Sequence, residues 1–200
     1  MEFQENILQA IFQTSVWEWL AVLSGILYVI FISFKQPIAW FFALINSILY
    51  IYLCFISQLY IETGLQFFYV IMAIYGWMSW TNKRISAEDK IIRWPIKYHL
   101  LNFGISATIA LVLGLLFDNF TNQAYPYADA FTGVFSLAAT FMVTKKVLEN
   151  WIYWILIDAI CIFLFAARDL YLSAVLFFVY TLIAIFGLLH WKKQFKQQEI

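Results

Sequence analysis

The sequence has little charge. Only 12% of its 200 residues are Asp, Glu, Lys or Arg, whereas a soluble domain carries about 25%. Hydrophobic residues make up 64% and aromatic residues 21%, and the mean hydropathy is +0.80. This composition excludes an ordinary soluble domain and points to the lipid bilayer. The net charge is zero, which gives a nucleic-acid partner no electrostatic support.

Residues that carry most enzyme chemistry are also scarce. The two histidines, His99 and His190, lie near the ends of apolar runs. The two cysteines, Cys54 and Cys161, lie inside such runs without the spacing of a metal site. The sequence contains no P-loop, GxSxG or HExxH motif. We therefore expect no enzyme activity, no cofactor and no metal ion, and we interpret the cysteines as small buried thiols.

Seven apolar runs each approach the roughly 20 residues that a membrane-spanning helix needs. They cover residues 17–34, 37–57, 60–80, 96–117, 128–144, 148–167 and 170–191. Polar stretches separate the runs, and all three prolines lie at these breaks. We therefore predict an all-α integral membrane protein with seven transmembrane helices. A short amphipathic helix over residues 1–15 is expected to precede them at the membrane surface.

The basic residues are divided unevenly between the two sides of such a bundle. Ten of the 12 lie in the breaks after the first, third and fifth runs or after the last run. Lys97, at the start of the fourth run, lies on the same side, and Arg168 alone lies on the opposite side. The positive-inside rule then predicts a cytoplasmic C-terminus and an N-terminus outside. Five tryptophans at predicted helix ends are interpreted as interfacial anchors: Trp17, Trp19, Trp80, Trp94 and Trp191.

The chain also repeats itself. Residues 59–80 align with residues 170–191, which lie 111 positions further along, and Tyr, Gly and Trp match in register as well as apolar residues. The same displacement aligns three further pairs: Glu18 with Asp129, Lys35 with Lys146 and Trp40 with Trp151.

Two three-helix repeats follow from this alignment, one over residues 17–80 and the other over residues 128–191. The helix at 96–117 joins them, so both repeats have the same orientation in the membrane. A single domain of this 3+1+3 layout over residues 1–200 is typical of a transporter whose site lies at the repeat interface.

The stretch WIYWILID carries the most distinctive candidate residues. Trp151, Trp154 and Asp158 are spaced i, i+3 and i+7, which puts them on one face of a helix. Asp158 lies near the middle of its span and is the only acidic residue deep in any of the seven runs. A carboxylate there costs about 2.5–3.5 kcal/mol on insertion scales and indicates a functional site. The alternative is a carboxyl group that only ties neighbouring helices together.

Other candidates come from the remaining runs. Asn46 lies near the middle of the second run, where the second repeat has Asp158, and a purely interhelical hydrogen bond is its competing interpretation. The further candidates are Trp40, Tyr50, Gln66, Tyr69, Trp77 and Tyr180. Aromatic faces attract cations, amides pair with amides or hydroxyls, and a carboxylate supplies a counter-charge. Together they suit a small planar metabolite, including a cationic one, that carries a sugar or an amide.

WIYWILID, together with the stretches INSILY and LQFFYVIMAIYGWMSW, resembles the PnuC family of bacterial nicotinamide riboside transporters and its WxxWxxx(N/D) pattern. SWEET sugar transporters share the 3+1+3 layout. The resemblance implies facilitated diffusion of nicotinamide riboside across the bacterial inner membrane. A separate cytoplasmic kinase would trap the vitamin by phosphorylation for NAD biosynthesis. The resemblance also implies a homo-oligomer, a trimer in similar proteins, surrounded by membrane lipids.

Several alternatives stay open at this point. The substrate of a related transporter would be thiamine, riboflavin or a sugar. Transport coupled to protons is a further alternative, because a desolvated Asp can change its protonation state near neutral pH. A seven-helix sensor or a membrane scaffold is the alternative from a different class, although no signalling domain is recognisable in the sequence.

Overall fold

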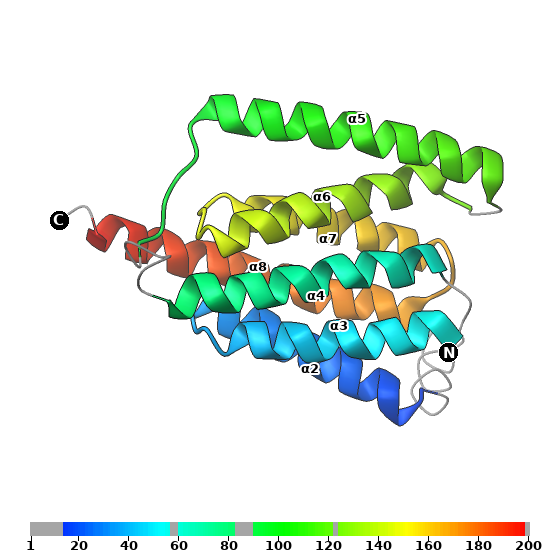
Figure 1. Cartoon of the computed structure of the whole chain (residues 1–200), viewed down its shortest axis with the longest axis horizontal. Coiled ribbons are helices and arrows are strands. Elements are labelled where there is room, and N and C mark those ends of the chain that lie inside the picture. Colours follow the sequence, from blue (N-terminus) through cyan, green and yellow to red (C-terminus); the bar gives the residue numbers. More distant parts are fainter. Residues whose placement is uncertain (1–13, 57–59, 83–89, 122–123, 199–200) are drawn as a thin grey trace. The chain divides into compact units, whose positions relative to one another are not determined.

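The computed structural model describes residues 14–56, 60–82, 90–121 and 124–198. All regular elements of these residues are helices, seven in number, and the only strand-like pairing among them is one isolated bridge (Figure 1). The prediction of an all-α protein is confirmed. The amphipathic helix expected over residues 1–15 falls almost entirely outside the described residues.

The chain divides into two compact units, residues 1–89 and residues 90–200. In the first unit, α3 (Ala39–Ile56) packs against both α2 (Val16–Ser33) and α4 (Tyr60–Thr81). Each helix therefore contacts its neighbour in the sequence, as short connections favour.

The second unit contains four helices in which each packs against the next along the chain. They are α5 (Ile96–Phe120), α6 (Pro126–Thr144), α7 (Asn150–Ala166) and α8 (Tyr171–Gln198). Among the described helices, α5 packs mainly against α6, and its His99 side chain also contacts Tyr153 of α7. Its buried residues are Ser106, Ala110 and Gly114, which are small and four positions apart, so α6 can approach closely. The helix expected to join the two repeats thus belongs to the second unit.

The helix boundaries agree with the predicted runs to within three residues, with one exception. α8 continues to Gln198, beyond the predicted end at Trp191. The added residues are mostly Lys and Gln, which are good helix formers. The helix can therefore continue beyond the end of the apolar run.

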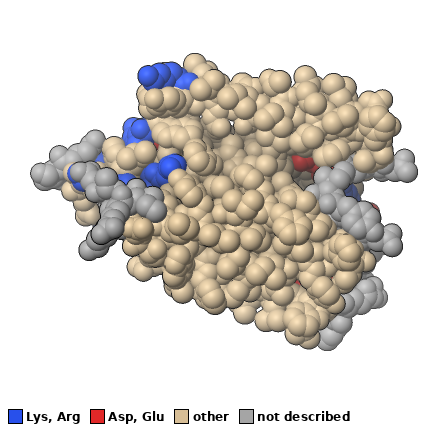
Figure 2. Space-filling model, in the orientation of Figure 1, with Lys and Arg blue, Asp and Glu red and all other residues tan. Residues whose placement is uncertain are grey.

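Five of the described helices are long and apolar enough to cross a membrane: α2, α3, α5, α6 and α8. α7 is apolar but has only 17 residues, a length of about 26 Å. α4 has 22 residues and is less apolar, since it carries Glu62 and Gln66. Large apolar side chains are exposed along most of α5, as expected of a lipid-facing surface. In Figure 2, Lys and Arg occupy small areas of a face that is otherwise almost uncharged.

The two turns that precede α3 and α7 have the same geometry. Lys35 and Lys146 both adopt a left-handed backbone conformation, with φ of 56° and 55°. Lys35 N–H donates to Ile32 O at 2.8 Å, and Lys146 N–H donates to Val143 O at 2.9 Å. A residue of positive φ that closes a helix end in this way stops the helix and reverses the chain. Residues 111 positions apart, such as Lys35 and Lys146, therefore match in backbone conformation as well as in sequence.

The packing of two tryptophan pairs, 111 positions apart in the sequence, is also the same in the two units. Trp40 and Trp80 meet edge to face with ring centroids 5.5 Å apart, and so do Trp151 and Trp191. All four side chains are buried. Trp80 and Trp191 are therefore not interfacial anchors, and that prediction is wrong for them because each fills the space beside another indole. Trp17 and Trp19 are exposed, as an anchor requires.

Candidate functional site

The middle of α7 presents Trp154 and Asp158 one helical turn apart. Trp154 packs against a core cluster of Phe135, Ala139, Ile157 and Cys161, which joins α6 to α7. Asp158 is only 3% exposed. The second unit thus holds a carboxyl group in an apolar and aromatic environment.

Among the described residues, none forms a hydrogen bond or an ion pair with Asp158. The basic residue next along the chain, Arg168, is already engaged, because its Nη2 contacts Asp129 Oδ2 at 2.5 Å. Arg168 also lies over the Tyr125 ring, 5.5 Å from its centroid. A buried carboxyl group without a partner is costly, so its presence needs an explanation other than packing.

Trp151 lies on the predicted stripe, but its surroundings differ from those of Trp154. Its side chain is 1% exposed and packs on Gly187 of α8, where an added Cβ would lie 2.7 Å from the indole ring. Its indole Nε1 is buried and has no hydrogen-bond partner. Trp151 therefore fixes α7 against α8, and the unused N–H is its one polar atom available to a ligand.

Trp40 occupies the matching place in the first unit. It is also 1% exposed, packs on Gly76 of α4 and has a buried indole Nε1 without a partner. The two tryptophans are thus equivalent in packing as well as in sequence.

Asn46 forms hydrogen bonds between α3 and α2. Its Nδ2 donates to Ala21 O at 2.7 Å and to Ser24 Oγ at 3.3 Å. The competing interpretation from the sequence, an interhelical tie, accounts for both bonds. The amide oxygen has no hydrogen bond to a described residue, so the side chain still offers one acceptor.

The remaining candidates are half-buried or exposed. Tyr50, Gln66 and Tyr69 are half-buried in the first unit, and Trp77 is 41% exposed. In the second unit, Tyr180 is half-buried and meets Phe177 edge to face. Phe177 in turn stacks on Phe165 of α7, and Trp151 lies on Gly187, so Tyr180 is at about the level of Asp158.

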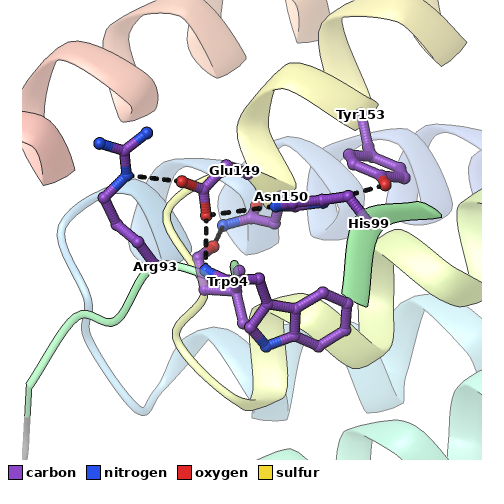
Figure 3. Close-up of polar contacts among 7 residues, drawn as sticks. Arg93, Trp94, His99, Glu149, Asn150 and Tyr153 are labelled. Atoms are coloured by element: carbon purple, nitrogen blue, oxygen red, sulfur yellow. Dashed lines mark hydrogen bonds and ion pairs between the residues drawn. The ribbon is translucent and has the colours of Figure 1, made fainter. Parts of the chain in front are cut away.

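A second polar cluster was not predicted from the sequence. Glu149, just before α7, accepts hydrogen bonds from Arg93 Nε at 2.7 Å and from the Trp94 backbone N–H at 3.3 Å. His99 Nε2 lies 3.9 Å from the same carboxylate, and His99 Nδ1 is 3.2 Å from Tyr153 Oη. In Figure 3, Arg93 and the backbone nitrogen of Trp94 contact Glu149 from the segment before α5. His99 of α5 lies between Glu149 and Tyr153 of α7.

Backbone pairing supports this cluster. Ile92 N–H donates to Lys146 O at 3.0 Å, and Leu148 N–H donates to Ile92 O at 2.8 Å. We call these two segments, residues 90–95 and the turn 145–150, the clasp. The sequence contains one indication of the clasp. Where the second repeat has the acidic residue Glu149, the first repeat has the apolar residue Ile38.

No group of three or more His, Cys, Asp or Glu side chains in the described part of the chain is placed to hold a metal ion.

The sequence model of the family described as "Nicotinamide mononucleotide transporter" matches residues 15–193. The chain belongs to this family. It is thus a member of a family of membrane transporters, and its several long apolar helices agree with a multi-pass membrane protein.

Individual proteins of known name are similar to the chain. The nicotinamide riboside transporter PnuC of Escherichia coli (strain K12) is 26% identical over 200 aligned residues, which cover 87% of this chain and 84% of that protein. The riboflavin/roseoflavin transporter RibM of Streptomyces davaonensis is 23% identical over 136 residues, covering 65% and 63%. The crystal structure of the vitamin B3 transporter PnuC shares the fold, with a TM-score of 0.74 at 24% identity over 98% of this chain and 88% of that one.

Proposed function

We propose that the protein carries nicotinamide riboside across the bacterial inner membrane. The observation that carries this proposal is the buried, unpartnered carboxyl group of Asp158 with the Trp154 indole one turn away. The pyridinium ring of nicotinamide riboside is planar and positively charged, so it suits an indole face and a carboxylate. The similarity to proteins named as nicotinamide riboside transporters supports the same substrate.

The distribution of basic residues favours the riboside over its phosphorylated form. No Lys or Arg lies in α2, α3, α4, α6 or α7, and those of α5 and α8 lie at helix ends. A phosphate group at mid-depth would therefore face Asp158 with no cation to balance it. The neutral ribose hydroxyls need only hydrogen-bond partners, which Asn46, Gln66 and Tyr180 can supply.

The route of transport follows from the repeat. In the arrangement that we propose, the 3+1+3 layout has its N-terminus outside and its C-terminus in the cytoplasm. The two three-helix repeats alternate around a midplane site. In the second repeat, Trp154, Asp158 and Tyr180 would contact the substrate, and Trp151 would hold α7 against α8. In the first repeat, Asn46, Tyr50, Gln66, Tyr69 and Trp77 would contact the substrate, and Trp40 would hold α3 against α4. Movement down the substrate gradient, maintained by intracellular phosphorylation, would supply NAD biosynthesis. The active form would be a homotrimer.

Binding to purified protein tests the substrate. Isothermal titration with nicotinamide riboside should give a saturable signal, which Trp154→Ala weakens and Trp17→Ala, far from α7 in sequence and exposed, leaves unchanged. Absence of a saturable signal in the folded wild-type protein would refute the proposal.

A second candidate substrate, riboflavin, is favoured by the similarity to RibM. Its ring system is uncharged, so it would leave Asp158 without a counter-charge. Competition decides between the two: unlabelled riboflavin or thiamine should displace labelled nicotinamide riboside poorly. A lower inhibition constant for riboflavin than for nicotinamide riboside would reverse the assignment.

A further inference from the structure

Three separate segments of the second unit meet at one end of its helices. The Ile91 backbone N–H donates to Gln198 Oε1 at 3.1 Å, which joins the segment before α5 to the last turn of α8. The path of this segment toward the end of α8 can be followed in Figure 1. The clasp joins the same segment to the turn between α6 and α7. Residues that are far apart in the sequence therefore form one surface.

Basic side chains gather on this surface. Seven of the 12 Lys and Arg residues in the sequence are exposed within residues 90–98, 145–150 and 190–198. The only acidic residue described in these ranges is Glu149, whose side chain is 11% exposed and is paired with Arg93. The surface therefore carries an excess of positive charge. We call its seven exposed basic residues the basic collar: Lys90, Arg93, Lys97, Lys145, Lys192, Lys193 and Lys196.

The last part of α8 holds three of these residues in fixed positions. The residues from Lys192 to Gln198 continue the helix beyond its apolar run, and they add about 10 Å to its length. The headgroup layer on one side of a bilayer is about 5–8 Å thick, which is half the difference between the whole bilayer and its hydrocarbon core. Lys192, Lys193 and Lys196 lie within about 100° of one another around the helix. Their charges are therefore presented together at the depth of the headgroups.

Large apolar side chains are exposed beside the basic collar. At the start of α5, Ile96 is 72% exposed and Leu100 is 66% exposed. Between them, the Lys97 ammonium group lies 5.1 Å from the centroid of the exposed Tyr98 ring. On α8, Leu189 is 62% exposed just before the first lysine of the collar. A soluble anion makes no use of such a border, whereas a phospholipid places its acyl chains against it.

The described residues of the first unit form no such surface. Lys35 is the only Lys or Arg among them, although its turn has the same backbone geometry as the turn that carries Lys145. The basic collar is therefore a property of the second unit, and the turn that the two units share does not account for it.

We propose that the basic collar binds the phosphate groups of anionic phospholipids such as phosphatidylglycerol, with the acyl chains on the neighbouring apolar side chains. Each Lys or Arg close to an anionic membrane surface raises the binding constant roughly fivefold. One exposed residue gains little, but several that are fixed on one surface act together. A bound lipid touches both the segment before α5 and the end of α8, so it stabilises the folded second unit.

Lipid titration of the purified protein tests the proposal. Thermal unfolding in detergent is followed while dioleoylphosphatidylglycerol or dioleoylphosphatidylcholine is added, and native mass spectrometry counts the bound lipids. We expect phosphatidylglycerol to bind about tenfold more tightly than phosphatidylcholine and to raise the unfolding temperature. Salt at 1 M, where the Debye length is about 3 Å, should remove this preference. Equal affinities for the two lipids at low salt would overturn the proposal.

Variants assign the lipid to the basic collar. Lys192→Gln, Lys193→Gln and Lys196→Gln, combined in one protein, remove three charges and keep good helix formers. This variant should lose about tenfold in affinity for phosphatidylglycerol, and it should unfold at the wild-type temperature in phosphatidylcholine. The corresponding triple variant with Arg keeps the charges and should bind as the wild type does. Undiminished affinity in the Gln variant overturns the assignment, and so does a loss of affinity in the Arg variant.

Inorganic phosphate distinguishes a lipid surface from a site for a soluble anion. Added in excess over the lipid at constant ionic strength, it should neither displace phosphatidylglycerol nor raise the unfolding temperature, because it brings no acyl chains to the apolar border. Stabilisation by inorganic phosphate equal to that by phosphatidylglycerol would overturn the proposal in favour of a soluble ligand.

Discussion

The indole of Trp151 lies directly on the Cα of Gly187. A methyl group added there would stand 2.7 Å from the ring, closer than van der Waals contact allows. Trp40 and Gly76 stand in the same relation in the first unit. α7 carries the Asp158 carboxyl group, so this contact helps to set the position of that carboxyl group.

Gly187→Ala should destabilise the second unit. The added methyl group forces the buried indole or the two helices apart, at a cost of about 1–3 kcal/mol for overpacking. Thermal unfolding in detergent, followed by tryptophan fluorescence, measures the effect. Gly104→Ala is the matched control, because nothing lies within 4 Å of an added Cβ on that glycine. Equal unfolding temperatures for the two variants would contradict the packing described for Trp151.

Glu149→Gln should cost more stability than Arg93→Gln, although the two residues form one ion pair. The Arg93 side chain is 63% exposed and that of Glu149 is 11% exposed. Loss of an exposed partner costs at most about 1 kcal/mol. Glu149 also accepts the Trp94 N–H and lies near His99, so its neutralisation weakens several contacts of the clasp. Chemical unfolding of both variants tests this order, and the reverse order would show that the clasp does not centre on Glu149.

Asn46→Ala should separate a structural role from a binding role. The hydrogen bond to Ala21 O joins α3 to α2, and such bonds within membranes contribute about 0.6 kcal/mol on average. A residue that only ties helices should lower the unfolding temperature slightly and leave the dissociation constant of nicotinamide riboside unchanged. We expect both the unfolding temperature and the dissociation constant to change, because the amide oxygen of Asn46 remains available to the substrate. An unchanged dissociation constant would remove Asn46 from the site. Ser24→Ala serves as control: it removes the weaker bond from Asn46 and the bond from Ser24 to Ala21 O, and it keeps the bond from Asn46 to Ala21 O.

Asp129→Asn should loosen the connection between α6 and the segment after α7. The carboxylate holds Arg168 at 2.5 Å, and both side chains are about three-quarters buried. The loss leaves a partly buried Arg168 without its partner, which costs more than an exposed pair does. A double-mutant cycle with Arg168→Gln measures the coupling energy, and a value near zero would mean that the contact contributes nothing to stability.

The matching tryptophan contacts of the two units were indicated by the sequence, because the aligned residues are chemically unusual ones. Trp40 with Trp151, Gly76 with Gly187 and Trp80 with Trp191 match at one displacement. In each set the first indole packs on the glycine and meets the second indole edge to face. The roles of single residues were harder to predict. Helical periodicity places Trp151 and Trp154 on one face of the helix. It does not predict that α8 covers Trp151, or that Trp154 packs against the cluster shared by α6 and α7.

The clasp was not predictable for a different reason. Glu149 and Arg93 are 56 positions apart, and nothing in local propensity brings such residues together. Their contact depends on the bridge between Ile92 and Val147, which forms outside any regular strand. A sequence pattern of period 2 or 3.6 carries no information on a pairing of one residue with another.

Substrate exchange in proteoliposomes tests the central claim most directly. Vesicles that contain only the purified protein are loaded with unlabelled nicotinamide riboside and diluted into a trace of the labelled compound. The account predicts rapid, saturable entry of label, with transient accumulation driven by the outward flow of unlabelled substrate and loss of this signal in Trp154→Ala. Entry no faster than in protein-free vesicles, with correctly folded and inserted protein, would contradict it.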